Sequence, residues 1–238
     1  MNHGSAKWFW AMPALLLAAG FAALGFWQQS RGEQKREWLA AWEHALAAEP
    51  VPFAQATSRS EDSPPLRVQG ELRFRAAPHM LLDNQQREGR IGVRAYALAD
   101  TEGLAAPLLV ELGWLPMEAD RALPAFEVPQ DPRHVSGVLV QMPGQGLKLG
   151  ENPWKAGGDP VLLTYLSPEE IKAAAGTSLT PGLLRPDPQL PLGFARDTVL
   201  LPNTLPPERH YGYAVQWWGL SATVIVVYLV LAWRRKAR

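Results

Sequence analysis

Two runs of uncharged, mainly apolar residues stand at the two ends of the chain. Residues 8–27 contain 20 consecutive positions without Asp, Glu, Lys or Arg, and residues 211–233 contain 23. A helix rises about 1.5 Å per residue, so each run can cross a hydrocarbon layer of roughly 30 Å. Tryptophans, whose rings favour the membrane interface, stand at or near the ends of both runs, at positions 8, 10, 27, 217, 218 and 233. The pattern predicts two transmembrane helices, 8–27 and 211–233.

Basic flanking residues predict how the chain crosses the membrane. The tail 234–238 reads RRKAR, and short basic flanks stay in the cytoplasm. Two crossings then place residues 1–7 in the cytoplasm as well, and residues 28–210 outside it, in the bacterial periplasm. The flanks of the first run are mixed, with Lys7 before it and Arg31, Lys35 and Arg36 after it, so the tail decides. We expect a two-pass protein of the bacterial inner membrane, in contact with the lipid bilayer.

Each run has an alternative interpretation. The first shares features with a cleaved signal peptide, but it is longer than the usual apolar core of one and its ending Phe26-Trp27-Gln28 is a poor cleavage site. The alternative interpretation of the second run is a buried core helix of a soluble protein. Its 23 uncharged residues and the basic cluster after them favour a membrane span instead.

Residues 28–65 are predicted to form a helix followed by a linker. Trp38, Trp42 and Leu46 recur every four residues in a segment that Pro50 ends, which is typical of an amphipathic helix. We expect it to continue the first membrane helix and to pack on its own domain; the alternative is that the two tryptophans bind a partner. Residues 50–65 are polar and rich in proline, which predicts a linker.

From residue 66 the hydrophobic pattern changes to that of strands. Residues 66–74 alternate apolar and polar side chains, as a strand with one solvated face does. Ser167 and Gly176 predict the start and end of a short helix, and the proline-rich segment 181–207 is expected to be mostly irregular. Further strands are predicted at 80–82, 92–98, 107–115, 135–142 and 160–165, in an antiparallel meander. The predicted fold class is α+β, with two terminal transmembrane helices flanking one antiparallel β-rich extracytoplasmic domain, residues 66–210, that contains a short helix.

Composition excludes several classes of function. The 23 basic and 23 acidic residues balance, and no basic stripe interleaves with aromatic residues, which argues against nucleic acid. The chain has no cysteine, so disulfides, thiol catalysis and thiolate metal sites are excluded. The five histidines have no metal-binding spacing, and GxSxG, P-loop, GxGxxG and HExxH motifs are absent from the sequence. We therefore expect neither an enzyme nor a metal site.

One cluster with candidate chemistry is the segment 82–92, LDNQQREGRIG, which is predicted to be a turn between strands. Gly89 and Gly92 would supply the positive φ that a bulged hairpin connection needs. Arg87 and Arg90 are candidates for binding a carboxylate or a lipid headgroup. A charged turn at a sheet edge explains them equally well.

A second cluster stands at the outer mouth of the second membrane run. His210 is followed there by the tyrosines at 211 and 213 and the tryptophans at 217 and 218. An imidazole at the membrane surface with aromatic rings a turn away suits an axial ligand to a flat hydrophobic cofactor. The alternative is an interfacial histidine in an aromatic belt, and the residues alone favour that alternative.

Five segments, at 67–74, 82–92, 110–116, 151–154 and 210–217, stand in order along nearly the whole chain. Together they resemble the motifs of the SURF1 (Shy1) family of cytochrome c oxidase assembly factors. The opening strand resembles the family's first strand motif through Arg67, Val68, Gly70 and Phe74, and ENPW at 151–154 resembles an Asn/Pro/Trp region before a short helix. Segment 82–92 resembles L-x-N-x-x-x-x-G-x-x-G and includes Asn84, Gly89, Arg90 and Gly92. VELGWLP at 110–116 resembles V-N-R-G-W-(V/L)-P and includes Gly113, Trp114 and Pro116. HYGYAVQW at 210–217 resembles H-x-x-Y-A-x-(Q/T)-W and includes His210, Tyr213, Gln216 and Trp217.

This resemblance implies an assembly factor for a haem-copper cytochrome c oxidase that contacts oxidase subunit I, with haem a synthase as a further partner. It maps to His210 the proposed binding of haem a and its delivery to subunit I, with Tyr213, Gln216 and Trp217 beside it. The residues of the other motifs are implied to serve partner contacts or structure. Glu111-Leu112 and Glu208 depart from the family pattern, which usually has Asn-Arg and often Asn at these places. The rival hypotheses are a cofactor-free membrane scaffold for the oxidase and a membrane-tethered enzyme acting on the envelope.

Overall fold

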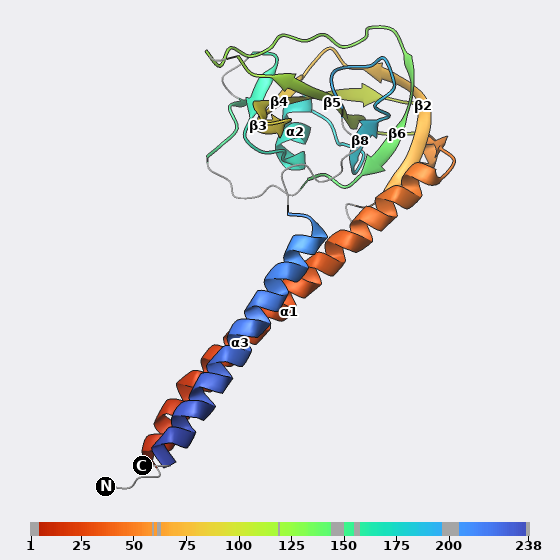
Figure 1. Cartoon of the computed structure of the whole chain (residues 1–238). Helices are drawn as coiled ribbons and strands as arrows, with labels where there is room; N and C mark the ends of the chain where they lie inside the picture. The colour runs from red at the N-terminus through yellow and green to blue at the C-terminus, as the bar shows by residue number, and fades with distance from the viewer. Residues whose placement is uncertain are drawn as a thin grey trace. The chain divides into compact units, whose positions relative to one another are not determined.

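The computed structural model describes residues 5–58, 60, 63–118, 120–143, 150–154, 158–196 and 205–236. Predictions for residues 1–4, for the Trp8 and Trp10 side chains, for 197–204 and for the end of the basic tail lie outside the described residues. The chain forms two compact units, Met1–Ala40 with Thr204–Arg238, and Ala41–Asn203. Figure 1 shows the elements of each.

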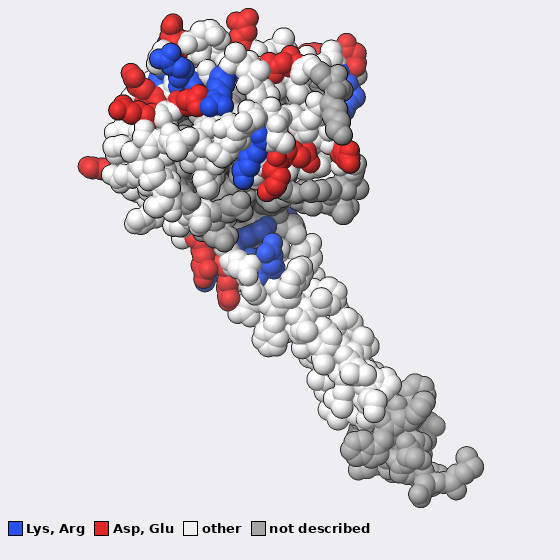
Figure 2. Space-filling view, turned by 180° about the vertical axis from the view of Figure 1, so that it is seen from behind, with Lys and Arg blue, Asp and Glu red and all other residues white. Residues whose placement is uncertain are grey.

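The first unit consists of two long helices, α1 (Ser5–Ala47), whose last turns belong to the second unit, and α3 (Pro207–Lys236). Each is long and apolar enough to cross a membrane, over Ala11–Ala47 and Pro207–Arg234. The first predicted span and the amphipathic segment after it form one continuous helix, as expected. On the face that Figure 2 shows, most of the described length of this unit carries no charged side chain. Large apolar side chains such as Leu16 and Trp233 are 68% and 72% exposed, as lipid-facing residues would be.

The two helices run antiparallel and pack small residues against large ones. Ala18, Gly25 and Gly32 of α1, spaced by seven residues, meet Ser221, Trp218 and Tyr211 of α3 respectively. A Cβ on Gly25 would overlap the Trp218 indole, and one on Gly32 would lie 2.8 Å from the Tyr211 ring. The Ser221 hydroxyl donates a hydrogen bond to the Ala18 carbonyl at 2.8 Å. Lipid provides no hydrophobic drive for association, so close packing of this kind and hydrogen bonds between helices hold the pair together.

The second unit is built around a barrel of five strands. The strands pair in the order β2 (Leu66–Phe74), β6 (Arg133–Val140), β8 (Leu183–Pro186), β5 (Leu108–Pro116) and β4 (Arg90–Asp100). The ring closes because Arg73 and Phe74 of β2 pair with Asp100 and Ala99 of β4. β3 (Met80–Arg87) and β7 (Val161–Leu163) extend the sheet beyond β4, and β1 (Val51–Pro52) pairs with β2. Closure pairs edges that an open sheet would leave free.

Alternate residues of the ring strands fill the interior of the barrel. The buried core includes Val68, Leu72, Val93, Ala95, Ala97, Leu108, Val110, Leu112, Val135, Leu139 and Leu184. Burying a side chain of valine or leucine size contributes about 1.5–3 kcal/mol. Phe53, in the short 3-10 helix η1 (Phe53–Ala56), is 2% exposed and packs over Gly70.

The strand predictions are confirmed in outline and corrected in detail. Residues 66–74 form β2, and the short helix α2 (Pro168–Ala175) has the expected N-cap Ser167 and the left-handed Gly176 at its end. The segment 50–65, predicted to be a linker, contains β1 and η1, and the segment predicted to be irregular contains β8. Both strands are too short to show a period, and each contains proline, which argues locally against a strand. The meander holds for β3, β4 and β5, whereas β1–β2, β3–β7 and β5–β8 pair in parallel.

Candidate functional site

His210 lies in the first turn of α3 and is 8% exposed. Its Nδ1 atom is 2.7 Å from Oε1 of Gln28, a residue of α1 that is 182 positions away in the sequence. A carboxamide oxygen can only accept a hydrogen bond, so this contact is a hydrogen bond when the proton of the ring is on Nδ1. The Nε2 atom is buried and has no hydrogen-bond partner among the described residues.

The antiparallel helix pair creates this arrangement. Gln28 directly follows the first apolar run, and His210 directly precedes the second. The C-terminal end of the first run therefore lies beside the N-terminal end of the second. Further along, the Lys35 ammonium donates to the carbonyl oxygen of Leu205 at 2.5 Å. The Tyr211 hydroxyl is also buried without a partner in the described chain. Such an atom costs about 1–3 kcal/mol when it stays unpaired, so it marks a place where function is to be sought.

The other predicted site residues of α3 do not surround the imidazole. Tyr213 is 38% exposed, and Gln216 is exposed as well. Both lie on a flank of α3 that turns away from α1. Trp217 is half-buried and stacks on Phe21 with ring centroids 5.6 Å apart. The residue that does reach His210 is Gln28, which sequence reasoning missed because no local pattern joins positions so far apart.

The segment 82–92 is a longer hairpin than predicted. Residues up to Arg87 belong to β3, and the turn itself consists of Glu88 and Gly89, with φ of 51° and 75°. Positive φ at both central residues is the conformation that matches the twist of a two-residue hairpin. Asn84, with φ of 56°, lies where the register of β3 against β4 shifts.

Gly92 does not use the conformational freedom predicted for it; it provides space. A Cβ there would lie 2.6 Å from the Trp114 ring. The Trp114 indole donates to the Gln85 carbonyl at 2.8 Å, and the Arg90 guanidinium lies 5.8 Å from the ring centroid. The hairpin residues and Trp114 therefore form one packing cluster, in which Arg90 covers an aromatic ring.

The barrel also contains a buried group of charges around Glu111, which the sequence analysis named only as a departure from the family pattern. Glu111 of β5 is 4% exposed and pairs with Arg94 of β4 at 2.8 Å and with Arg185 of β8 at 3.4 Å. The Arg185 guanidinium lies 5.4 Å from the ring centroid of Trp42 in the last turns of α1. Trp42 therefore packs on its own domain, as predicted. A lone acid in the apolar run 108–115 was the available signal.

Further polar groups lie next to this cluster. Asp187 pairs with Arg67 at 3.0 Å and accepts from the Ser136 hydroxyl at 2.5 Å. Arg196 donates to the carbonyls of residues 112, 187, 190 and 194. Burial lowers the pKa of the Arg196 guanidinium, and the charges of Glu111 and Asp187 oppose that shift. Burial also raises the pKa of the Tyr96 phenol, with a further rise from Glu111.

The sequence model of the SURF1 family matches residues 15–222. The chain belongs to the SURF1 family. Members of this family are known as cytochrome oxidase assembly factors and are generally non-enzymatic. No curated protein matches the chain. The match covers the whole barrel and part of each apolar helix, from residue 15 in α1 to residue 222 in α3.

The remaining motif residues of this SURF1 protein hold the barrel together. Gly113, with φ of 119°, lies at a bulge where a Cβ would come 2.8 Å from the carbonyls of Phe194 and Ala195. Pro116 ends β5 opposite Gly92. Leu112, at a family arginine position, is 1% exposed in the core, and the guanidinium that reaches its carbonyl is that of Arg196, at 3.4 Å.

The Asn/Pro/Trp region of the SURF1 protein joins a loop to α2. The Asn152 amide group donates to Glu170 at 2.8 Å and to the Tyr165 carbonyl at 3.1 Å, and its oxygen accepts from Thr164 N at 2.9 Å. The Trp154 indole and the Tyr165 hydroxyl also donate to Glu170, at 2.9 Å and 2.6 Å. This bond to the carboxylate raises the pKa of Tyr165. The motif thus serves structure.

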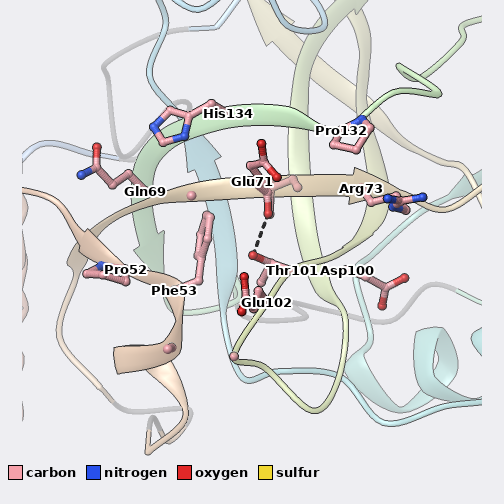
Figure 3. A pocket seen from close by; sticks show the side chains of 14 residues that line it. Pro52, Phe53, Gln69, Glu71, Arg73, Asp100, Thr101, Glu102, Pro132 and His134 are labelled. Carbon is pink, nitrogen blue, oxygen red and sulfur yellow. Dashed lines mark hydrogen bonds between the residues drawn. The ribbon is translucent and has the colours of Figure 1, made fainter.

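A cleft of about 690 Å³ opens on one side of the barrel of the SURF1 protein. Figure 3 shows Glu71 and His134 on neighbouring strands, with Phe53 below them and Thr101 donating to the Glu71 carbonyl at 2.7 Å. Acidic and basic groups are mixed here, and no three metal-ligating side chains gather anywhere in the described residues.

The SURF1 resemblance implies a haem ligand at His210. The surroundings of His210 fit that role in one respect. A histidine that would hold haem iron must offer a ring nitrogen with a free lone pair, and a second group usually holds the other nitrogen. His210 has both features, since Gln28 binds Nδ1 and Nε2 is unpaired. Nε2 is covered by protein atoms, so a porphyrin would reach it only after neighbouring side chains move.

Proposed function

We propose that this SURF1 protein holds haem a through His210 while it assists the assembly of a haem-copper cytochrome c oxidase. The observation that carries the proposal is the His210 Nε2 atom, which is buried at the end of an apolar helix and lacks a partner among the described residues. A neutral imidazole nitrogen is the commonest kind of protein ligand to haem iron. The haem would bring the redox-active iron that the oxidase subunit needs.

We further propose where this happens and with which partners. Two apolar terminal helices support a two-pass membrane protein, and the basic tail supports cytoplasmic termini with the barrel in the periplasm. Tyr213 and Gln216 face outward from α3, and polar groups on membrane helices commonly bond to neighbouring helices. They are the proposed contacts with oxidase subunit I. Haem a synthase is the proposed source of the haem.

The test uses the full-length protein purified from cells that make haem a. We expect a Soret absorption band in the wild type and a loss of at least tenfold in bound haem for His210→Ala. The matched control is His134→Ala, because His134 is exposed in the barrel cleft and should leave haem content unchanged. A Soret band that survives His210→Ala would refute the site.

A cofactor-free scaffold is the second candidate, and the covered position of Nε2 favours it. In that case the purified protein has no Soret band, but deletion of the gene still lowers the amount of assembled oxidase. The haem proposal expects the oxidase that remains to be deficient in haem a. A deletion strain with fully haem-loaded oxidase at normal levels would contradict both candidates.

A further inference from the structure

Gln28 is the only group that the described residues show bonded to the ring of His210. Its carboxamide oxygen approaches Nδ1 to 2.7 Å, which is a short distance for an N–H···O bond. A free imidazole distributes its proton between the two nitrogens. A buried acceptor at Nδ1 removes that choice, because only the Nδ1–H form can donate to it.

We propose that Gln28 is a positioning residue that holds His210 in the Nδ1–H form, so that Nε2 presents its lone pair as a ligand atom. This inference rests on the haem site proposed above for its purpose, but the state of the ring can be measured without haem. The bond also fixes the ring plane, because the donor N–H must point at the oxygen of α1.

Position explains why this acceptor is a glutamine. The bond forms where the apolar runs of α1 and α3 end, next to Trp27 and Tyr211. A carboxylate in a poorly solvated place is strongly disfavoured unless it is paired. A carboxamide supplies an acceptor oxygen without a charge, so the ring stays neutral and Nε2 keeps its lone pair. Groups that bind the second nitrogen of a ligating histidine commonly affect metal affinity 10–100-fold.

The first experiment measures the ring state in the haem-free, full-length protein. Nitrogen-15 NMR of histidine-labelled protein in lipid nanodiscs distinguishes protonated from unprotonated ring nitrogens, and His210→Ala assigns the signals. We expect a protonated Nδ1 and an unprotonated Nε2 in the wild type. Gln28→Leu should shift the signals to a mixture that contains the Nε2–H form, whereas Gln28→Glu, which keeps an acceptor oxygen, should keep Nδ1 protonated.

Gln29→Leu is the matched control, because Gln29 is the next residue of α1 and bonds to Glu33 at 2.8 Å. It should leave the His210 signals unchanged. An Nε2–H form in the wild type would overturn the inference, because the carboxamide would then donate to Nδ1. Identical ring signals in the wild type and Gln28→Leu would overturn it as well. Circular dichroism checks that each variant remains helical, and Gln28→Glu keeps the test decisive if Gln28→Leu does not fold.

The second experiment separates this inference from the proposed function. In the haem-loaded protein, Gln28→Leu should weaken haem binding about 10–100-fold and alter the electron paramagnetic resonance spectrum of the ferric iron, while Gln29→Leu changes neither. Absence of haem in the wild type, with the expected NMR result, would refute the haem proposal and leave the role of Gln28 in place. Haem binding that is equal in both Gln28 variants and the wild type would refute the role of Gln28 as a positioning residue.

Discussion

Replacement of Glu111 by glutamine tests the buried charges of the barrel. The variant keeps the shape of the side chain and removes its charge. Glu111 is 4% exposed and lies 2.8 Å from Arg94 and 3.4 Å from Arg185. In Glu111→Gln, the two guanidinium groups on β4 and β8, the strands on either side of β5, lose the carboxylate between them. We therefore expect the barrel to unfold more easily.

The size of the effect follows from this geometry. At an effective dielectric constant of about 20, opposite unit charges 4 Å apart attract by about 4 kcal/mol. Removal of one member of a buried ion pair typically costs about 3–5 kcal/mol, because the remaining charge is left buried. A loss of 1 kcal/mol lowers the Tm of a domain of this size by about 2–4 °C. The expected decrease in Tm is therefore roughly 6–20 °C.

Near-ultraviolet circular dichroism of the full-length protein in detergent measures the change, since Trp42 packs beside Arg185 and reports on the cluster. The matched control is Glu71→Gln on β2, because Glu71 is exposed. A surface substitution of this kind changes stability by no more than about 0.5 kcal/mol. If Glu111→Gln melts within 2 °C or so of Glu71→Gln, the argument from buried charge is wrong.

Three more predictions follow from single contacts. Gly25→Leu should separate α1 from α3, because a side chain there overlaps the Trp218 indole. Gly20→Leu is the control, because it has open space and should leave the helices together. A disulfide cross-link between Ala18→Cys and Ser221→Cys, in a chain without native cysteine, should therefore fail in Gly25→Leu and form in Gly20→Leu. Tyr96→Phe should reduce the alkaline sensitivity of the barrel, because the pKa of the phenol is raised in the folded wild type. The contribution of Tyr96 to wild-type stability is therefore full below about pH 10 and falls by about 1.4 kcal/mol per pH unit above it. Equal decreases in Tm between pH 9 and pH 11 in the wild type and the variant would contradict this. Asn152→Ala should cost about 2–3 kcal/mol, since it removes the hydrogen bonds of the amide group to the Tyr165 carbonyl, Glu170 and Thr164 N. A Tm equal to that of the wild type in a thermal melt would show that these bonds contribute nothing.

Local pattern was enough for the elements that have a clear period. The apolar runs at the two termini predicted α1 and α3, because membrane thickness sets a length that no other segment of the chain reaches. Residues 66–74 predicted β2 without error, since nine alternating positions leave one interpretation. The ends of α2 were marked by Ser167 and Gly176, whose roles depend only on neighbouring backbone groups.

Strands that have no repeating pattern of apolar residues were not predicted. β1 has two residues and β8 has four, and both contain proline. They form strands because the backbone of β2 pairs with β1, and the backbones of β5 and β6 pair with β8. The closed barrel thus depends on β8, which fills the place between β5 and β6. A strand that forms only because other strands pair with it cannot be recognised from its own residues.

The candidate site divides in the same way. The sequence by itself determined that His210 stands beside an apolar helix and that the chain resembles SURF1 proteins, because motifs are local and ordered along the chain. Only the tertiary structure decided that Gln28 binds Nδ1 of His210 and that Glu111 is held between Arg94 and Arg185. The physical reason is that a hydrogen bond or an ion pair depends on distance in space, and the pairing of α1 with α3 and the closing of the barrel set those distances.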